Sequence, residues 1–254
     1  MIDVHSHIVF GVDDGAKEIE QSAKMLQEAK EAGFHKIIVT PHYMEEYYEC
    51  NKKEIAEKIE QIREKMPIDM QIFQGNEIYI TNRINSLLEE EKATTLNNSQ
   101  YVLFELPINA EPFNITEVVY QILEQGRVPI LAHPERYPYI QKNPNKLIPL
   151  IEDGVLMQCN YGSIIGIYGK EPKETIKKLL EHHMVHFLGS DTHRPNSIYP
   201  RIPQAVEEIN KIVGEEEQKL LTTVHPEAII QNQKIEEIEN PIPIKKKSFF
   251  KLFN

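Results

Sequence analysis

The chain opens with the sequence MIDVHSHIVFGVDD, residues 1–14. Ile2, Val4 and the apolar run at residues 8–10 predict a short buried strand that continues into a loop. Alternate side chains of a strand point to the same side, so His5 and His7 should project together. Two neighbouring imidazoles at a strand end can hold one divalent metal ion, but they can also be ordinary polar residues at a sheet edge. The remaining sequence has to distinguish these two interpretations.

Length and composition describe an ordinary soluble protein. The 254 residues are enough for one large α/β domain or two small ones, and 41% are hydrophobic and 26% charged. A net charge of −11 argues against a nucleic-acid partner, because there is no overall basic field to attract phosphates. We find no N-terminal signal segment and no run of 18 apolar residues, and Cys50 and Cys159 are too few for a disulfide framework. We therefore expect a cytoplasmic protein without a transmembrane segment.

Short apolar segments alternate with amphipathic ones along most of the chain. Apolar strands that alternate with helices imply a parallel sheet, because parallel strands need crossover connections. Seven such strands fit a closed or nearly closed (β/α) barrel better than an open, doubly wound sheet, which remains the alternative. Strands are expected at the start of the chain and at residues 36–40, 70–74, 101–104, 128–132, 155–159 and 185–188. Helices are expected at 16–32, 51–66, 81–91, 114–125, 144–153, 172–182, 203–212, 214–222 and 226–232.

No linker or low-complexity segment divides residues 1–235, so we predict one domain there, followed by a tail at 236–254. Pro241 and Pro243 cannot continue a helix, and residues 245–253 are basic and aromatic. This end could contact an acidic partner or a membrane surface. The preferred interpretation is either a frayed tail or a strap that packs Phe249, Phe250 and Phe253 on the barrel.

Histidines and carboxylates stand near the predicted strand ends. In a parallel barrel the carboxyl ends of all strands open on one face, so residues far apart in the sequence would converge there. A mixed set without thiolate suits Mn, Fe or Zn, and it is too large for one ion, so two or three ions are expected. Such ions lower the pKa of a shared water and hold phosphoryl oxygens. The candidate ligands are His5, His7, Asp14, His42, Glu77, Glu105, His133, Asp191 and His193.

Five short motifs resemble those of the PHP (polymerase and histidinol phosphatase) superfamily. They are Asp3-Val-His5-Ser-His7, Thr40-Pro-His42, Gly75-Asn-Glu77, His133-Pro-Glu-Arg136 and Ser190-Asp191-Thr-His193. With Gly11-Val-Asp-Asp-Gly15, residues 1–235 resemble the manganese-dependent protein-tyrosine phosphatases of Gram-positive capsule loci, the CpsB/CapC type. The resemblance implies a distorted (β/α)7 barrel, the PHP fold, holding two to three divalent ions, with Mn²⁺ expected first and Fe or Zn possible.

The resemblance also implies how the ligands are shared. One site would use His5, His7, Glu77 and Asp191; the second would share Glu77 and add Glu105 and His133; the third would use Asp14, His42 and His193. Asp13 could take the place of Asp14, so that choice stays open.

Cationic side chains are needed beside the metals to hold a phosphate. Arg136 follows His133 by three residues and could donate to two phosphate oxygens; alternatively it forms a salt bridge with Glu135 or starts a helix. The family has an Arg-x-Pro further on, which Arg201-Ile-Pro203 matches, and Arg194 is the competing choice for a second contact. Asp191 or His193 could donate a proton through water.

Other residues of the same types receive a structural interpretation. His35, His182, His183 and His186 flank predicted strands away from the cluster, and His225 starts a helix. The tyrosines that follow His42 could line a substrate groove or simply lie on the surface. They are Tyr43, Tyr47 and Tyr48.

The motifs favour one reaction class. Neither cysteine begins a Cys-x5-Arg motif, and no Walker loop is present, which leaves metal-assisted hydrolysis with hydroxide attacking phosphotyrosine in line. The resemblance implies the Tyr-rich tail of a bacterial tyrosine autokinase, a regulator of capsule or exopolysaccharide synthesis, as substrate and partner. Histidinol phosphate or another small phosphomonoester is the alternative substrate, and the acidic charge disfavours a DNA 3′-end exonuclease. The alternative of another class is a non-catalytic metal-binding module that binds a partner.

Overall fold

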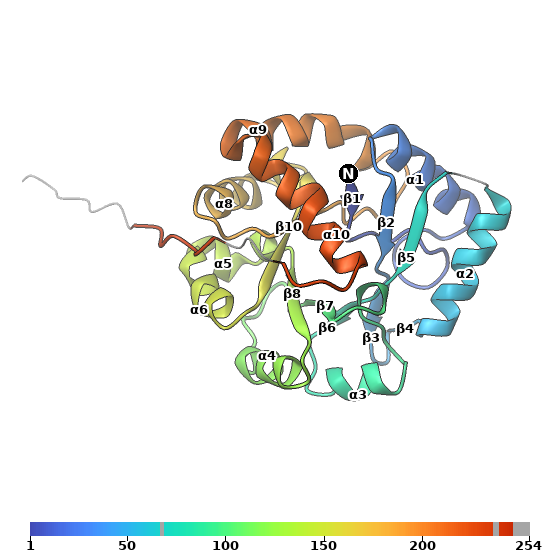
Figure 1. Ribbon diagram of the computed structural model, residues 1–254, viewed down its shortest axis with the longest axis horizontal. Coiled ribbons are helices and arrows are strands. Elements are labelled where there is room, and N and C mark those ends of the chain that lie inside the picture. Colours follow the sequence, from blue (N-terminus) through green and yellow to red (C-terminus); the bar gives the residue numbers. More distant parts are fainter. Residues whose placement is uncertain (67–68, 236–238, 246–254) are drawn as a thin grey trace, which may run out of the picture.

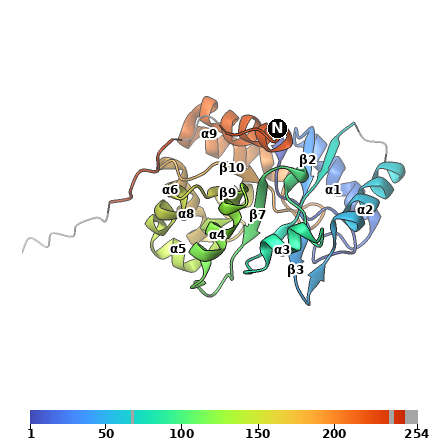
Figure 2. The same cartoon turned by 60° about the horizontal axis from the view of Figure 1, so that its bottom comes forward.

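The computed structural model describes residues 1–66, 69–235 and 239–245. Its strands form two sheets. The smaller sheet joins β1 (Ile2–Asp3), β2 (Lys36–Val39) and β5 (Gln71–Gln74), all parallel. The larger sheet has the order β10 (Phe187–Gly189), β9 (Leu156–Asn160), β8 (Val128–Ala132), β7 (Tyr101–Glu105), β6 (Glu77–Tyr79), β3 (His42–Met44) and β4 (Tyr48–Glu49). Every pair in it is parallel except the β3–β4 hairpin, which projects from the barrel (Figure 2).

The two sheets together make a nearly closed barrel. Only two residues separate β2 from β3 and β5 from β6, so each of these pairs occupies one strand position of the barrel with a short interruption. Each strand position of the barrel is called a stave below. The first and last staves meet at a single bridge between Ser6 and Thr192, where the His7 N–H donates to the Thr192 carbonyl at 3.0 Å. The expected α/β barrel of seven staves is therefore confirmed, with its weakest closure between β1 and β10.

The helices cover the outside of the barrel (Figure 1). The longer ones are α1 (Ile19–Glu31), α2 (Lys52–Lys65), α4 (Ile115–Glu124), α8 (Lys170–Glu181) and α9 (Ile202–Lys219). The shorter ones are α3 (Ile84–Glu89), α5 (Pro138–Lys142), α6 (Leu147–Glu152), α7 (Tyr161–Ile164) and α10 (His225–Ile230). Helix α2 illustrates why they form: Asn51 caps it by accepting from Glu54 N, and Ile55, Ile59 and Ile62 bury one face.

The barrel interior is divided into an apolar and a polar half. Along β7, Tyr101 and Leu103 belong to the inner hydrophobic cluster, whereas Val102 and Phe104 belong to the cluster under the helices. Alternation places the next inward side chain, Glu105, beyond this apolar layer. Helix α10 and Ile235 close the apolar end, because Ile229 and Ile235 pack in the same inner cluster. The polar half thus faces the carboxyl ends of the strands.

Two element predictions need correction. The sequence predicts a first strand that runs through residues 8–10, but β1 ends at Asp3. Beyond it, His5 and His7 bond with Asp191 and Thr192, and Ser6 bonds with Thr40. Strands β3, β4 and β6 were not predicted. The two helices expected at 203–212 and 214–222 are confirmed: the segment labelled α9 is two helices that meet at a break at Gly214 (φ 84°), and a π-helical turn follows at Leu220–Val224.

Residues 239–245 lie against the barrel's helices. The Ile242 N–H donates to the His182 carbonyl at 2.9 Å, and Ile244 and Asn145 exchange two hydrogen bonds of 2.8 and 2.9 Å. The strap predicted at Phe249, Phe250 and Phe253, and the basic run beside it, fall outside the described residues. No helix in the described ranges is long and apolar enough to cross a membrane.

Candidate metal centre

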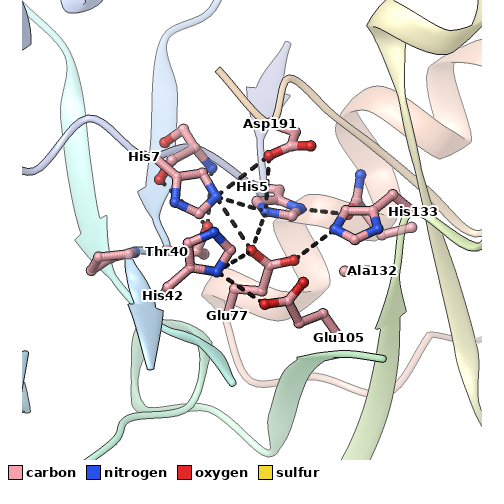
Figure 3. Close-up of polar contacts among 12 residues, drawn as sticks. His5, His7, Thr40, His42, Glu77, Glu105, Ala132, His133 and Asp191 are labelled. Atoms are coloured by element: carbon pink, nitrogen blue, oxygen red, sulfur yellow. Dashed lines mark hydrogen bonds and ion pairs between the residues drawn. The ribbon is translucent and has the colours of Figure 1, made fainter. Parts of the chain in front are cut away.

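All nine candidate ligands lie in one cluster in the polar half of the barrel, and Figure 3 shows seven of them. At its centre, the Nε2 atoms of His5 and His7 are 3.1 Å apart. Glu77 Oε2 lies 3.2 Å from the first and 3.3 Å from the second, and Asp191 Oδ1 lies 3.6 and 3.4 Å from them. The residues come from positions up to 186 apart in the sequence, as the barrel prediction required.

Glu77 connects the rest of the cluster to this pair. Its Oε1 lies 2.8 Å from His133 Nε2, and its Oε2 lies 3.0 Å from His42 Nδ1, which is also 3.2 Å from Glu105 Oε1. His42 is therefore shared, since its Nε2 lies 3.5 Å from Asp14 Oδ1. His193 Nε2 lies 3.3 Å from the same Asp14 oxygen.

Two candidate ligands have an unusual backbone conformation. His133 follows β8 and Asp191 follows β10, and both have positive φ, 37° and 50°. In β8, Ile130 and Ala132 point inward, so a regular strand would turn the side chain of His133 outward. The left-handed conformation turns it back to Glu77. Such conformations are costly for residues other than glycine and gather at functional sites.

Neighbouring groups fix which nitrogen each imidazole presents. Gln158 donates its amide nitrogen to Asn160 Oδ1, so its Oε1, 2.7 Å from His5 Nδ1, must accept from that ring. His7 Nδ1 donates to Asp13 Oδ2 at 2.7 Å, and His193 Nδ1 donates to the Asp191 carbonyl at 3.0 Å. In all three rings the Nε2 lone pair consequently faces the cluster, as is usual for metal-binding histidines.

This arrangement fits divalent ions. Two lone pairs at 3.1 Å with a carboxylate oxygen beside them repel one another unless a cation or proton lies between them. Ligands that each bind one ion at about 2.0–2.2 Å stand about 3–3.6 Å apart, which is the spacing of this group. Buried Glu77 Oε2, His42 Nδ1 and Asp14 Oδ1 have no hydrogen-bond partner among the described residues. Unpartnered buried polar atoms of this kind indicate an ion site.

The pKa values of the clustered side chains also indicate that the cluster needs positive charge. Without a bound ion, burial opposes ionisation, yet a proton on His5 holds the pKa of Glu77 and of Asp191 well below the usual carboxyl range. Burial would also lower the pKa of His42, but Glu77 raises it to about 10. The cluster is thus a set of ionised carboxylates that require positive charge between them.

Comparison with known proteins places this site in a family. The family model described as "Capsular polysaccharide synthesis, CpsB/CapC" matches residues 1–231. The chain belongs to the CpsB/CapC family. It is 31% identical to the tyrosine-protein phosphatase YwqE of Bacillus subtilis, with all of both chains covered. It is 35% identical to the tyrosine-protein phosphatase CpsB of Streptococcus pneumoniae, covering 92% of this chain and all of that one.

The fold of a solved relative agrees. The chain matches a structure from work on YwqE and CpsB, described as unique metal-dependent tyrosine phosphatases. The TM-score is 0.90 at 31% identity, with 97% of this chain and 100% of that chain covered.

In this CpsB/CapC chain, Arg136 lies beside the cluster. Its Nη1 donates to Asp191 Oδ2 at 2.7 Å, and its guanidinium lies 4.8 Å from the centre of the Tyr168 ring. The alternative salt bridge with Glu135 is wrong, because that buried carboxylate accepts from Asn160 N and Ser163 Oγ. Arg136 ends the 3-10 turn Pro134–Arg136, and its side chain is 30% exposed, so it can reach a ligand.

The two other arginines considered for phosphate binding are not among the described residues that contact the cluster. Arg201 is exposed and donates to the Ser197 carbonyl at 2.6 Å. Arg194 is exposed and lines a separate cleft. Of the three tyrosines considered for a groove, Tyr48 stacks on His42 with ring centres 5.7 Å apart, Tyr47 is exposed and Tyr43 is buried.

The remaining histidines have structural contacts. His186 Nδ1 accepts from Met157 N, and His225 donates to the His186 carbonyl. His35 bonds the N-terminal amine, and His182 bonds the Ile242 carbonyl. None of these atoms faces the cluster in the described structure.

Sequence reasoning missed several supporting residues. Asp13 was considered only as a ligand, but its carboxylate holds His7 and accepts from Gly15 N and His42 N. Gln158 and Asn160 continue the inward row that begins at Leu156 in β9, so the alternation rule could have found them. Asp3 is fully buried and ties the two ends of the barrel together. It accepts from Ser190 N, His5 N and Tyr199 Oη.

Proposed function

We propose that this protein is a metal-dependent protein-tyrosine phosphatase. The observation that carries the proposal is the full set of nine histidine and carboxylate ligands in one cluster, with Arg136 fixed beside it. Membership of the CpsB/CapC family, whose relatives are named tyrosine-protein phosphatases, supports the reaction class.

The division of the ligands among metal sites is the one that the family resemblance implies, and the contacts support part of it. His5, His7, Glu77 and Asp191 would hold one ion, and Glu77 with Glu105 and His133 a second. Asp14, His42 and His193 would hold a third. Two to three ions, Mn²⁺ first, with Fe or Zn as alternatives, fit this donor set. Bound ions of this kind supply Lewis acidity and a water of lowered pKa.

Arg136 would bind the phosphate. One N–H of its guanidinium donates to Asp191, and one face of the guanidinium lies over the Tyr168 ring. The other N–H groups are left for phosphate oxygens. Because the site is partly buried, these donors would stabilise charge that develops on the equatorial oxygens. A second contact from Arg201, with Arg194 as the alternative, completes the proposal.

Proton transfer to the leaving group would fall to His193 or Asp191 acting through water. His193 is 26% exposed and has its Nδ1–H bonded to a carbonyl, so its Nε2 would exchange protons only in protein that holds two ions and leaves the site of Asp14, His42 and His193 empty. Asp191 is the weaker candidate, because its pKa lies well below the usual carboxyl range. The reaction has little need of a strong general acid, since a phenol with a pKa of about 10 is a better leaving group than an alcohol.

For the biological substrate we propose a tyrosine-phosphorylated tail of a bacterial tyrosine kinase in the cytoplasm, within capsule or exopolysaccharide synthesis. The support is the family description, which refers to capsular polysaccharide synthesis. The net charge of −11 makes a nucleic-acid substrate unfavourable.

The test compares substrates on defined metal-loaded protein. The protein is stripped with a chelator, reloaded with Mn²⁺, Fe²⁺ or Zn²⁺, and assayed on a phosphotyrosine peptide and on histidinol phosphate, with metal content measured by elemental analysis. We expect a higher kcat/KM for the peptide and loss of turnover under chelation. Preference for histidinol phosphate would refute the substrate. If metal-loaded protein hydrolysed neither compound and His133→Ala left cellular phenotypes intact, a non-catalytic binding module would be the better description.

A further inference from the structure

A cleft of about 530 Å³ lies next to the metal centre and belongs to none of the metal sites. One wall is formed by the chain leading into α1, with Lys17, Gln21 and Lys24. The other wall is the loop after His193, with Arg194 and Asn196. None of the described residues that line the cleft is acidic, although the whole chain carries a net charge of −11.

The cleft walls are held in place by hydrogen bonds. Asn196 N donates to both carboxylate oxygens of Glu28 on α1, at 3.0 and 2.9 Å. Asn196 has a left-handed conformation, with φ 61°, that directs this N–H to the helix. Lys17 Nζ donates to the Asp13 carbonyl at 2.8 Å. The cleft is therefore a built surface and not a gap between loose loops.

Its cations are not neutralised by neighbouring carboxylates. Lys24 and Arg194 are exposed, and neither has a carboxylate oxygen within 4.0 Å among the described residues; Lys17 contacts a carbonyl. Elsewhere lysines pair readily, as Lys52 does with Glu91. Three cations that share a cleft repel one another, and an anionic ligand would relieve this repulsion.

The position of the cleft links it to the substrate path. The cleft is also lined by Gly15, which directly follows Asp14, and Arg194 directly follows His193. Asp14 and His193 form the outer edge of the cluster, with side chains 50% and 26% exposed. A peptide with one side chain in the cluster would therefore cross this edge and extend over the cleft.

We propose that this cleft is a subsite for acidic side chains that flank the phosphotyrosine of a peptide substrate. The proposal rests on the phosphatase function proposed above and specifies its substrates. An acidic enzyme repels acidic peptides at long range, and a local group of cations offsets this repulsion. The same cations would favour phosphotyrosines that have acidic residues beside them in the sequence.

The test uses three phosphotyrosine peptides of equal length: one with glutamates before the phosphotyrosine, one with glutamates after it, and one with glutamines in all these positions. Wild-type protein with Mn²⁺ is expected to prefer at least one acidic peptide about tenfold in kcat/KM at low salt, and less at high ionic strength. Lys24→Glu should remove or reverse this preference, and Lys24→Gln should reduce it about threefold.

The matched control is Lys219→Glu, the same charge reversal at the C-terminal end of α9, which leads to the closed end of the barrel. This variant should keep the wild-type preference. Equal kcat/KM for all three peptides in the wild type, or an unchanged preference in Lys24→Glu, would overturn the subsite while the phosphatase function stood. Failure of the wild type to hydrolyse any of the three peptides would instead refute the function on which the subsite rests.

Discussion

Replacing Asp13 by Asn tests whether this residue, which is not counted among the ligands, controls metal binding through His7. The Asp13 carboxylate is buried and accepts three hydrogen bonds: from His7 Nδ1 at 2.7 Å, Gly15 N at 2.8 Å and His42 N at 3.0 Å. An asparagine can keep its oxygen toward His7 and His42, but its amide group then faces Gly15 N, a donor against a donor.

The expected magnitudes follow from these contacts. A buried donor left without an acceptor costs about 1–3 kcal/mol, so the free energy of unfolding should fall by about 2 kcal/mol. The charge of the carboxylate also makes His7 a better ligand, and loss of such an outer partner lowers metal affinity by about 10–100-fold. That range corresponds to about 1.4–2.7 kcal/mol. Since all nine ligands remain, the variant should regain most of its activity at high Mn²⁺.

The assay is a Mn²⁺ titration in chelator-buffered solution, followed by calorimetry for binding and by phosphotyrosine hydrolysis for activity. The control is Asp153→Asn, an exposed aspartate at the end of α6. If Asp13→Asn bound Mn²⁺ within twofold of the wild type, the orienting role would be refuted. Loss of activity at full metal occupancy would refute it too, because the residue would then act in another way.

Four further outcomes can be measured on the same protein. Arg136→Ala should lower kcat/KM for a phosphotyrosine peptide by about 10²–10³-fold, and a loss below tenfold in steady-state assays would remove it from phosphate binding. Arg201→Ala should cost more activity than Arg194→Ala, and the reverse order would reassign the second phosphate contact. Chelation should lower the melting temperature and Mn²⁺ should restore it, since an ion at 100 times its Kd adds about 2.7 kcal/mol per site; an unchanged temperature in scanning fluorimetry would argue against ion binding. Burial and the charge of His225 lower the pKa of His186 to about 3. Below the ordinary histidine pKa, the unfolded state therefore binds a proton that the folded state excludes. Stability falls as the pH drops from the ordinary histidine pKa towards the lowered one. Between pH 7 and pH 5 this loss of unfolding free energy is about 2 kcal/mol. In His186→Asn, which keeps an acceptor for the backbone, the loss measured by urea unfolding between these two pH values should be smaller by that amount. An equal pH dependence of stability in both proteins would contradict the assignment.

Much of the barrel could be predicted because its strands are short apolar runs between clear helices. Strand β8 has the predicted bounds, and β7 differs by one residue. The β3–β4 hairpin could not be predicted, because half of residues 42–49 are His or Glu and the segment carries no alternating pattern. The start of the chain failed for a different reason: Ile8 and Val9 are fully buried, but in a loop that packs against the helices. Burial was predicted correctly there, and the secondary structure was not.

The candidate ligands could be picked out from the sequence more readily than the residues that orient them. Histidine and carboxylate at strand ends are unusual enough to notice, whereas Gln158 and Asn160 resemble any polar residues near a turn. The choice between Asp13 and Asp14 depended on a three-dimensional contact with His7, which spacing alone does not contain. Arg136 was correctly placed beside the cluster, but its partner Asp191 lies 55 residues away.

The interrupted staves explain why the candidate ligands lie together although two strand ends were misplaced. The pairing of β2 with β5 and that of β3 with β6 share one register, since Val39 faces Gln74 and His42 faces Glu77, both 35 residues apart. Pro41 has no N–H and so breaks the ladder, and its carbonyl accepts from Glu77 N and from the Asn76 side chain instead.

Because the break neither adds nor removes a residue from the ladder, the alternation of inward and outward side chains continues through it. Ile38 and Phe73 point inward in the apolar half, and His42 and Glu77 point inward four residues later on the same staves. Gly75 lies inward between them, and a Cβ there would come within 2.7 Å of Leu96. The candidate metal centre is therefore the layer of these inward rows that lies nearest the carboxyl ends of the strands, which is why a rule for strand faces predicts that its side chains lie together.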